Sequence, residues 1–347
     1  MLSPRTDTIL RSLVGKYIVR AAPVPSQSLM EEAGLSVSSA TIRNEMARLE
    51  QGGYITRPHP SAGSIPSDMG YRYYVESLEN ITLPVAQQRL IDHLFHQVET
   101  KLEEWLSLAA ALLAHFGHNM AVVITPKPVR CRFKHLEIVS LQDTTALLVL
   151  VLRGAKVRQQ LVTFEGPVSQ AELGEASHRL NEDFAGFAHA AIAALPGERT
   201  PVERQFADCV VAIMRAEDDD GREATYLDGL HLVLEQPEFA DSPRVQGMVQ
   251  LTEHKDLPRM ILPQSLAERG VEVRIGRENE AELIRECSVV ASRYGVPDEA
   301  VGSIAVIGPT RMPYTQTIAT IDYLAWLLGR LLGQLYGKEE SSAPYNS

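Results

Sequence analysis

The sequence has few cysteines and no long apolar segment. Its three cysteines, Cys131, Cys209 and Cys287, lie far apart, which excludes a disulfide framework and zinc-finger spacing and fits a reducing compartment. The uninterrupted apolar stretches are short, such as Ala146–Leu152, and the amino terminus contains no apolar signal core. We therefore expect a cytoplasmic protein that is neither secreted nor inserted in a membrane.

The motifs that commonly mark phosphate binding or hydrolysis are also missing. The sequence contains no P-loop, no G-x-G-x-x-G and no G-x-S-x-G. The acidic run "EDDDG" resembles part of a calcium loop, but in that register Ala216 and Leu227 occupy the first and twelfth positions, where carboxylates are needed. We therefore expect no catalytic residue, no metal and no cofactor.

Negative charge exceeds positive charge, but not evenly along the chain. The net charge is −11, which argues against a protein that coats nucleic acid. Residues 1–79 nevertheless hold eight Arg or Lys and eight Asp or Glu, so this segment is neutral and the acidic excess lies downstream. The amino-terminal segment is therefore the part best suited to approach a polyanion.

Three short helices are expected at the amino terminus. Apolar spacing predicts the first over residues 3–20, the second runs from Ser26 to about residue 33, and Ser38 or Ser39 caps a third that ends near Gln51. The segment "YITR", a Pro- and Gly-rich loop and a fourth helix to about residue 79 follow. This layout is typical of a winged helix-turn-helix.

The third helix has two distinct faces. Ile42, Met46 and Leu49 form its buried stripe, whereas the opposite side carries Arg43 and Asn44. Asn suits bidentate contacts to adenine edges and Arg suits guanine edges. A solvated helix face is the alternative, but the two preceding helices and the following wing favour DNA recognition.

The rest of the chain alternates between helical and strand patterns. One long helical pattern covers residues 85–116, and four strand-like segments follow it. Helical patterns cover about residues 169–215 and continue through "TYLDGLHLVLEQPEF" to His254, after which strand patterns return before a last helix over about residues 313–335. The sequence therefore predicts an α+β domain that is interrupted by a helical insertion.

Four ordered motifs resemble the family of the heat-inducible transcription repressor HrcA. They are "SVSSATIRNEMARLEQGGYI", "PHPSAGSIPSDMGYRYYV", "LDGLHLVLEQPEF" and "VGSIAVIGPTRMPY". The resemblance implies an α+β multidomain repressor of chaperone operons that binds an inverted-repeat operator as a homodimer and is kept active by the GroEL chaperonin. It implies a winged-helix DNA-binding domain (1–79), a GAF-like domain in two halves (85–168 and 255–338) and an inserted dimerisation domain (169–254).

The two arguments meet on the residues expected to contact DNA. These are Ser26, Gln27, Ser38, Ser39, Thr41, Arg43, Asn44, Arg48, Arg57, His59, Ser61 and Ser64. The chain departs from the family pattern at Ser64, near Met69 and at Gln27, where basic residues are usual, and at Pro25, where a Gly is usual. Ser64 is expected at the tip of the wing, where an Arg would meet a phosphate.

Other functions fit the sequence less well than repression. A small effector could bind in the GAF-like domain and control the protein, although no convergent polar cluster is visible in the sequence. An enzyme built on the α+β domain lacks the expected motifs, and a chaperone-like interaction protein does not need the helix-turn-helix pattern.

Overall fold

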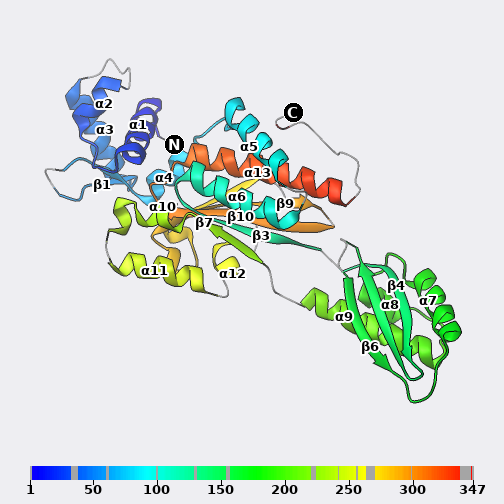
Figure 1. Cartoon of the computed structure of the whole chain (residues 1–347). Coiled ribbons are helices and arrows are strands. Elements are labelled where there is room, and N and C mark those ends of the chain that lie inside the picture. Colours follow the sequence, from blue (N-terminus) through cyan, green and yellow to red (C-terminus); the bar gives the residue numbers. More distant parts are fainter. Residues whose placement is uncertain are drawn as a thin grey trace.

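The structure is a computed structural model of the chain (Figure 1). It describes residues 2–32, 38–59, 62–98, 101–128, 131–153, 157–219, 224–240, 242–254, 257–262, 270–297, 299–336 and 345. No helix among these residues is both long and apolar enough to cross a bilayer.

The amino-terminal domain consists of four helices and a two-stranded hairpin. Ser3 caps the first helix by accepting a hydrogen bond from the Thr6 amide (3.2 Å). Ile9, Ile42 and Leu49 belong to the same fully buried core, as the apolar spacing predicted. The elements are α1 (Pro4–Arg20), α2 (Ser26–Glu32), α3 (Ser39–Gln51), β1 (Ile55–Thr56), β2 (Ile65–Pro66) and α4 (Asp68–Glu76).

A five-stranded antiparallel sheet forms the centre of the molecule, in the order β7-β3-β10-β9-β8. Successive side chains of a strand point to opposite faces. Ala121 and Val123 accordingly join one apolar core, and Met120 and Val122 join another. The strands are β3 (Met120–Pro128), β7 (Thr225–Asp228), β8 (Val271–Ile275), β9 (Cys287–Val296) and β10 (Ala300–Pro309).

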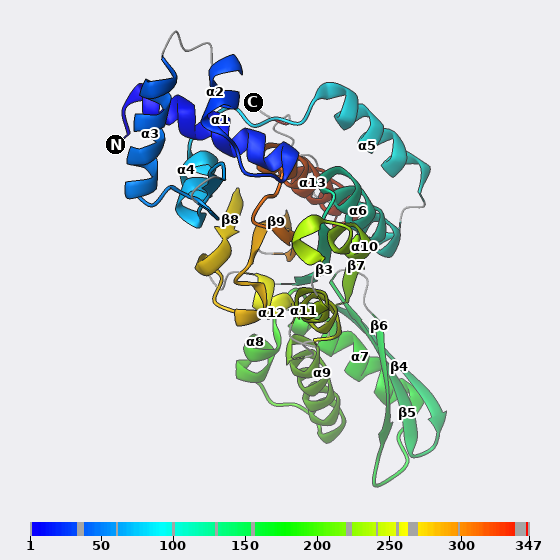
Figure 2. The ribbon, with the colours of Figure 1, turned by 90° about the vertical axis from the view of Figure 1, so that its left-hand side faces the viewer.

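Helices cover both faces of this sheet (Figure 2). One face packs against α6 (Leu102–Gly117) and α13 (Tyr314–Leu335), with α5 (Val85–Gln97) outside them. The other face packs against α10 (Leu230–Leu234), α11 (Ser242–Glu253) and α12 (Leu257–Ile261). The short 3₁₀ helices are η1 (Pro237–Phe239), η2 (Gly276–Glu278) and η3 (Glu282–Ile284).

A second, separate body projects from one end of the sheet (Figure 1). It is a three-stranded antiparallel sheet in the order β4-β5-β6, with helices on one face only. Leu148, Leu150, Leu180 and Phe206 lie in its own apolar core. Its elements are β4 (Phe133–Gln142), β5 (Thr145–Leu152), β6 (Val157–Thr163), α7 (Gln170–Phe184), α8 (His189–Ala194) and α9 (Pro201–Asp219).

This arrangement corrects where the inserted body begins and ends. The sequence placed residues 133–163 with the GAF-like domain and residues 220–254 with the insertion. In the structure, β4–β6 share a core with α7–α9, whereas α10 and α11 pack against the five-stranded sheet. Alternating apolar residues show that a strand has a buried face, but not which element covers it.

Two local expectations are also wrong. The helical pattern over residues 85–116 is two helices, because α5 ends at Gln97 and Val98 is extended (ψ 151°) before α6 begins at Leu102. The apolar spacing continues across this break and conceals it. Residues 225–228, expected in a helix, form strand β7 and pair with residues 121–124 of β3.

The first contact between the amino-terminal domain and the central sheet involves α4. Arg72 donates hydrogen bonds to the Glu278 carboxylate (Nε to Oε1, 2.8 Å) and to the Val273 carbonyl (2.6 Å). Burial alone would raise the pKa of Glu278, but hydrogen bonds from Arg72 and from the Ile275 amide lower it overall. The Arg72 guanidinium therefore binds both a charged side chain and the backbone of β8.

Asp68, at the start of the same helix, accepts a hydrogen bond from the Arg277 amide (3.2 Å). Its carboxylate lies directly against Gly276, whose φ is +55°. A Cβ at Gly276 would lie 2.2 Å from a carboxylate oxygen, so glycine is required for this approach.

Arg311 makes the second contact between the two domains. Its guanidinium donates to Glu238 (2.6 Å), to the Ile18 carbonyl near the end of α1 (2.8 Å) and to Gln236 (3.2 Å). The two contacts together hold α1 and α4 of the amino-terminal domain against the central domain.

Candidate nucleic-acid interface

Helix α3 has the amino-terminal cap and the buried apolar stripe that the sequence predicted. The Ser38 side chain accepts a hydrogen bond from the Thr41 amide (3.2 Å), which caps the helix. Ile42, Met46 and Leu49 are buried against α1 and the rest of the domain core. The opposite face of α3 is therefore turned outward.

Arg43 and Asn44 occupy this outward face. Both are exposed, and within the described part of the chain neither side chain has a hydrogen bond or an ion pair. Ser38 and Ser39 are exposed at the start of the helix, and Thr41 is half-buried one turn before Asn44. Unpaired donors on an exposed helix are available to base edges or phosphates.

Arg48 and Arg57 lie on the two sides of this face. Arg48 forms an ion pair with Glu45 (3.3 Å), and Arg57 forms one with Glu50 (3.2 Å). The structure brings both predicted arginines to the surface, but each one has a carboxylate partner within the protein. Their positive charge is therefore partly neutralised before any ligand arrives.

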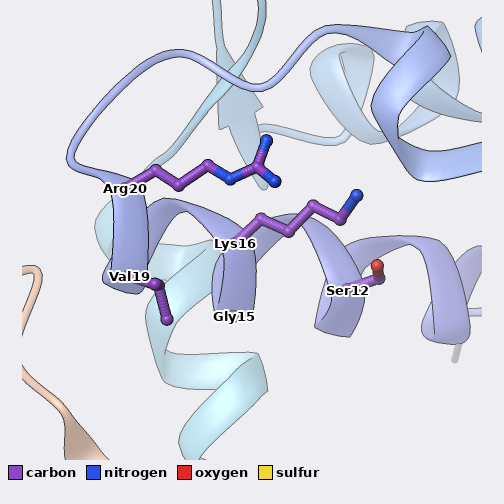
Figure 3. A pocket seen from close by; sticks show the side chains of 5 residues that line it. All are labelled: Ser12, Gly15, Lys16, Val19 and Arg20. Carbon is purple, nitrogen blue, oxygen red and sulfur yellow. The ribbon is translucent and has the colours of Figure 1, made fainter. Parts of the chain in front are cut away.

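The predicted DNA contacts on α2 lie beside a depression lined by two basic residues of α1, which the sequence analysis did not predict. Ser26 is half-buried and Gln27 is exposed in the first turn of α2. Figure 3 shows Lys16 and Arg20 of α1 extending in the same direction over a shallow depression of about 350 Å³. Lys16 donates to the Ser28 carbonyl, which joins α1 to α2. The i,i+4 spacing of Lys16 and Arg20 in the sequence already indicated that both cations lie on one side of α1.

The hairpin corrects one predicted contact. Ser64 is fully buried, and its backbone pairs with that of Val24 through two hydrogen bonds of 2.9 Å. A Cβ at Gly63 would lie 2.5 Å from the Val24 backbone, so this strand lies tightly against the α1–α2 connection. Ser64 therefore lies where the hairpin loop meets β2, against the α1–α2 connection, and not at the tip of the loop. His59 is exposed in the loop, and Ser61 lies outside the described residues.

A second depression, of about 380 Å³, lies at the start of α6. Lys101, Glu103, Thr125 and Tyr226 are among the residues that line it. The Thr125 hydroxyl already donates to the Ala224 carbonyl (2.8 Å). Burial and the nearby Glu103 carboxylate raise the pKa of Tyr226. No feature of these lining residues identifies a ligand, so control by a small effector stays a hypothesis.

Comparison with known proteins decides the family. Residues 103–318 match the family model described as the HrcA protein C terminal domain. The heat-inducible transcription repressor HrcA of Dehalococcoides mccartyi (strain ATCC BAA-2266 / KCTC 15142 / 195) is 51% identical to this chain, with 97% of this chain and 98% of that protein covered. The chain belongs to the HrcA family.

Further matches extend the HrcA assignment along the chain. The HrcA protein of Roseiflexus castenholzii (strain DSM 13941 / HLO8) is 40% identical, with 97% of this chain and 96% of that protein covered. Both HrcA relatives therefore include the amino-terminal domain, which the family model does not reach.

A solved structure titled a hypothetical protein is 21% identical, with a TM-score of 0.60 and coverage of 96% and 98% of the two chains. That likeness supports the mixed α/β fold. The HrcA relatives are named as heat-inducible transcription repressors.

Proposed function

We propose that this chain is a heat-inducible transcriptional repressor that reads an inverted-repeat operator with α3. The observation that supports this most directly is the exposed, unpaired Arg43 and Asn44 on a helix whose other face is buried. With α2 before it and the β1–β2 hairpin after it, α3 has the place of the recognition helix of a winged helix-turn-helix. The names of the relatives agree with this function.

The proposed repressor is a homodimer, since a two-fold operator requires a two-fold protein. The three-stranded sheet offers a surface for the second copy. Its inner face is covered by α7–α9, whereas its outer face carries apolar side chains beside His135, Glu137 and Gln159, and no helix of the described residues packs on it. Val139, Leu141, Val157 and Leu161 on the edge strands of this sheet are exposed. Self-association through this outer face replaces our expectation that the inserted helices carry the main dimer contact.

A charge on this outer face should dissociate the dimer. Leu161, which is 61% exposed, lies opposite Leu147 of β5 on the outer face. Burying a Leu contributes roughly 1.5–3 kcal/mol, counted twice in a symmetric dimer. We therefore expect Leu161→Lys to raise the dimer dissociation constant at least about a hundredfold in sedimentation.

The matched control for that variant is Leu283→Lys, because Leu283 is also exposed but lies in η3, on the other body. This control should leave the dimer intact. An unchanged dimer constant for Leu161→Lys would contradict the proposed surface. The interface would then move to α5, where Val85 and Leu90 are exposed.

The proposed circuit includes the GroEL chaperonin, which would keep the repressor in its active form until heat stress. Marginal stability makes such control possible, since 1–2 kcal/mol changes the active fraction several-fold. The GAF-like assignment of the central domain belongs to the same proposal and agrees with the helices that cover its five-stranded sheet.

Footprinting on the DNA upstream of the chain's own gene tests the whole proposal. We expect two protected arms in inverted repeat, loss of protection after mild heating, and slower loss when GroEL and ATP are present. No sequence-dependent protection would refute repression by operator binding. Protection that heating removes but chaperonin does not preserve would refute only the GroEL part.

A further inference from the structure

Two arginines beside the outward face of α3 form ion pairs with glutamates of α3. Arg57, at the end of the first hairpin strand, has its Nε 3.2 Å from Glu50 Oε2. Arg48 Nη1 lies 3.3 Å from Glu45 Oε1. One ion pair therefore joins α3 to the hairpin, and the other lies on α3 where Glu45 contacts α1, the helix that crosses α3 in Figure 2.

The Glu45 side chain is held in place by a hydrogen bond from α1. This side chain is only 8% exposed, whereas that of Arg48 is 72% exposed. The second carboxylate oxygen of Glu45 accepts a hydrogen bond from the Thr6 hydroxyl of α1 (2.9 Å), and that hydroxyl contacts the Ser3 side chain (2.6 Å). A buried carboxylate that loses its cation is destabilised, so Glu45 keeps Arg48 from moving freely toward an outside anion.

The donors on this surface therefore fall into two kinds, those without a partner in the protein and those paired with a carboxylate. Arg43 and Asn44 have no partner among the described residues and can bond to base edges without first breaking a contact. Arg48 and Arg57 must leave a carboxylate before either one can neutralise a phosphate. Phosphate contacts carry no sequence information, whereas base contacts do.

We propose that Glu45 and Glu50 set how tightly the DNA-binding surface holds DNA of any sequence. They compete with phosphates for Arg48 and Arg57, which lowers the affinity for DNA of any sequence and leaves base reading by Arg43 and Asn44 unchanged. The ratio between the affinities for operator and random DNA is then unchanged, whereas the total affinity is lower and fewer counterions are displaced on binding. This inference rests on the proposed function and adds to it two residues that do not themselves contact DNA.

The main test is Glu50→Gln, because Glu50 is half-exposed and its change should not disturb the core. The probes are a random-sequence duplex and a duplex selected from a random pool by the unmodified protein. Freed Arg57 should raise affinity for both duplexes by about 1.4- to 5-fold per subunit, the range that a surface ion pair implies. The plot of log K against log salt should steepen by about 0.9 for each subunit.

Three variants separate this effect from a simple change of net charge. Glu79→Gln removes one negative charge from the exposed end of the same domain and should leave the salt slope unchanged. Adding Arg57→Gln to Glu50→Gln should abolish the gain, because the released cation is then absent. Glu45→Gln keeps an acceptor for Thr6 and should steepen the slope as Glu50→Gln does.

The outcomes distinguish the inference from the function on which it rests. If the unmodified protein selects no duplex at all, operator binding itself fails. If it selects one, but Glu50→Gln and Glu45→Gln both keep the original salt slope, the inference is overturned and the ion pairs only stabilise the fold. A gain confined to the selected duplex would also overturn it, since phosphates do not differ between the two probes.

Discussion

Alanine at Arg43 or at Asn44 should abolish the preference of this protein for its operator while leaving the fold intact. Both side chains are exposed on α3 and have no partner among the described residues, so their removal exposes no buried polar group. A bidentate base contact contributes about 1–3 kcal/mol, and a dimer makes it twice. The affinity ratio between operator and random duplex should therefore fall by about 30-fold to more than 10⁴-fold.

Gel-shift competition between the two duplexes measures this ratio. Arg11→Ala is the matched control, since Arg11 is an exposed arginine of α1 whose ion-pair partner is Asp7 (3.8 Å). The control should keep the operator preference. Undiminished discrimination by both α3 variants would exclude α3 as the reading element.

Arginine at position 64 should destabilise the amino-terminal domain and should not strengthen DNA binding. Ser64 is fully buried between the hairpin and the α1–α2 connection, where its backbone pairs with Val24. A guanidinium in this place would be buried without a carboxylate, at a cost of several kcal/mol. That cost is comparable to the whole stability of a small domain, about 5–15 kcal/mol. We therefore expect Ser64→Arg to lose cooperative unfolding of this domain and all operator binding.

Ser64→Ala provides the control for size and burial. The Ser64 hydroxyl is buried and has no hydrogen-bond partner among the described residues. Its removal should leave the free energy of unfolding unchanged or slightly higher, as measured by denaturant titration. Conversely, a stably folded Ser64→Arg protein with a steeper salt dependence of DNA binding would mean that position 64 faces the phosphates after all.

Helix α3 was predictable because its signals are local. Ser38 as the cap, the apolar spacing of Ile42, Met46 and Leu49, and the glycines after Gln51 all lie within one short segment, and the structure confirms each of them. Local propensity and apolar pattern agreed in this segment, which is the condition for a reliable sequence-based prediction.

The position of Ser64 was not predictable, because it depends on pairing between distant residues. The hairpin strands have only two residues each, and the pairing of Ile55 with Pro66 fixes which loop residue lies at the tip. A shift of this register by one residue would turn the neighbouring side chains to the opposite face. Likewise, the ion pair of Glu50 with Arg57 and the burial of Glu45 beneath Thr6 depend on how the hairpin and α1 pack on α3, which the sequence pattern does not specify.

The contact between Arg72 and the Val273 carbonyl has a consequence for heat stress. Val273 lies in β8, one of the two edge strands of the central sheet, and its free edge would otherwise present unpaired backbone groups to other chains. The amino-terminal domain therefore covers an aggregation-prone edge at the same time as it presents α3. Heat that detaches this domain would uncover β8, and edge-to-edge association of the exposed strands would then make the loss of repression irreversible.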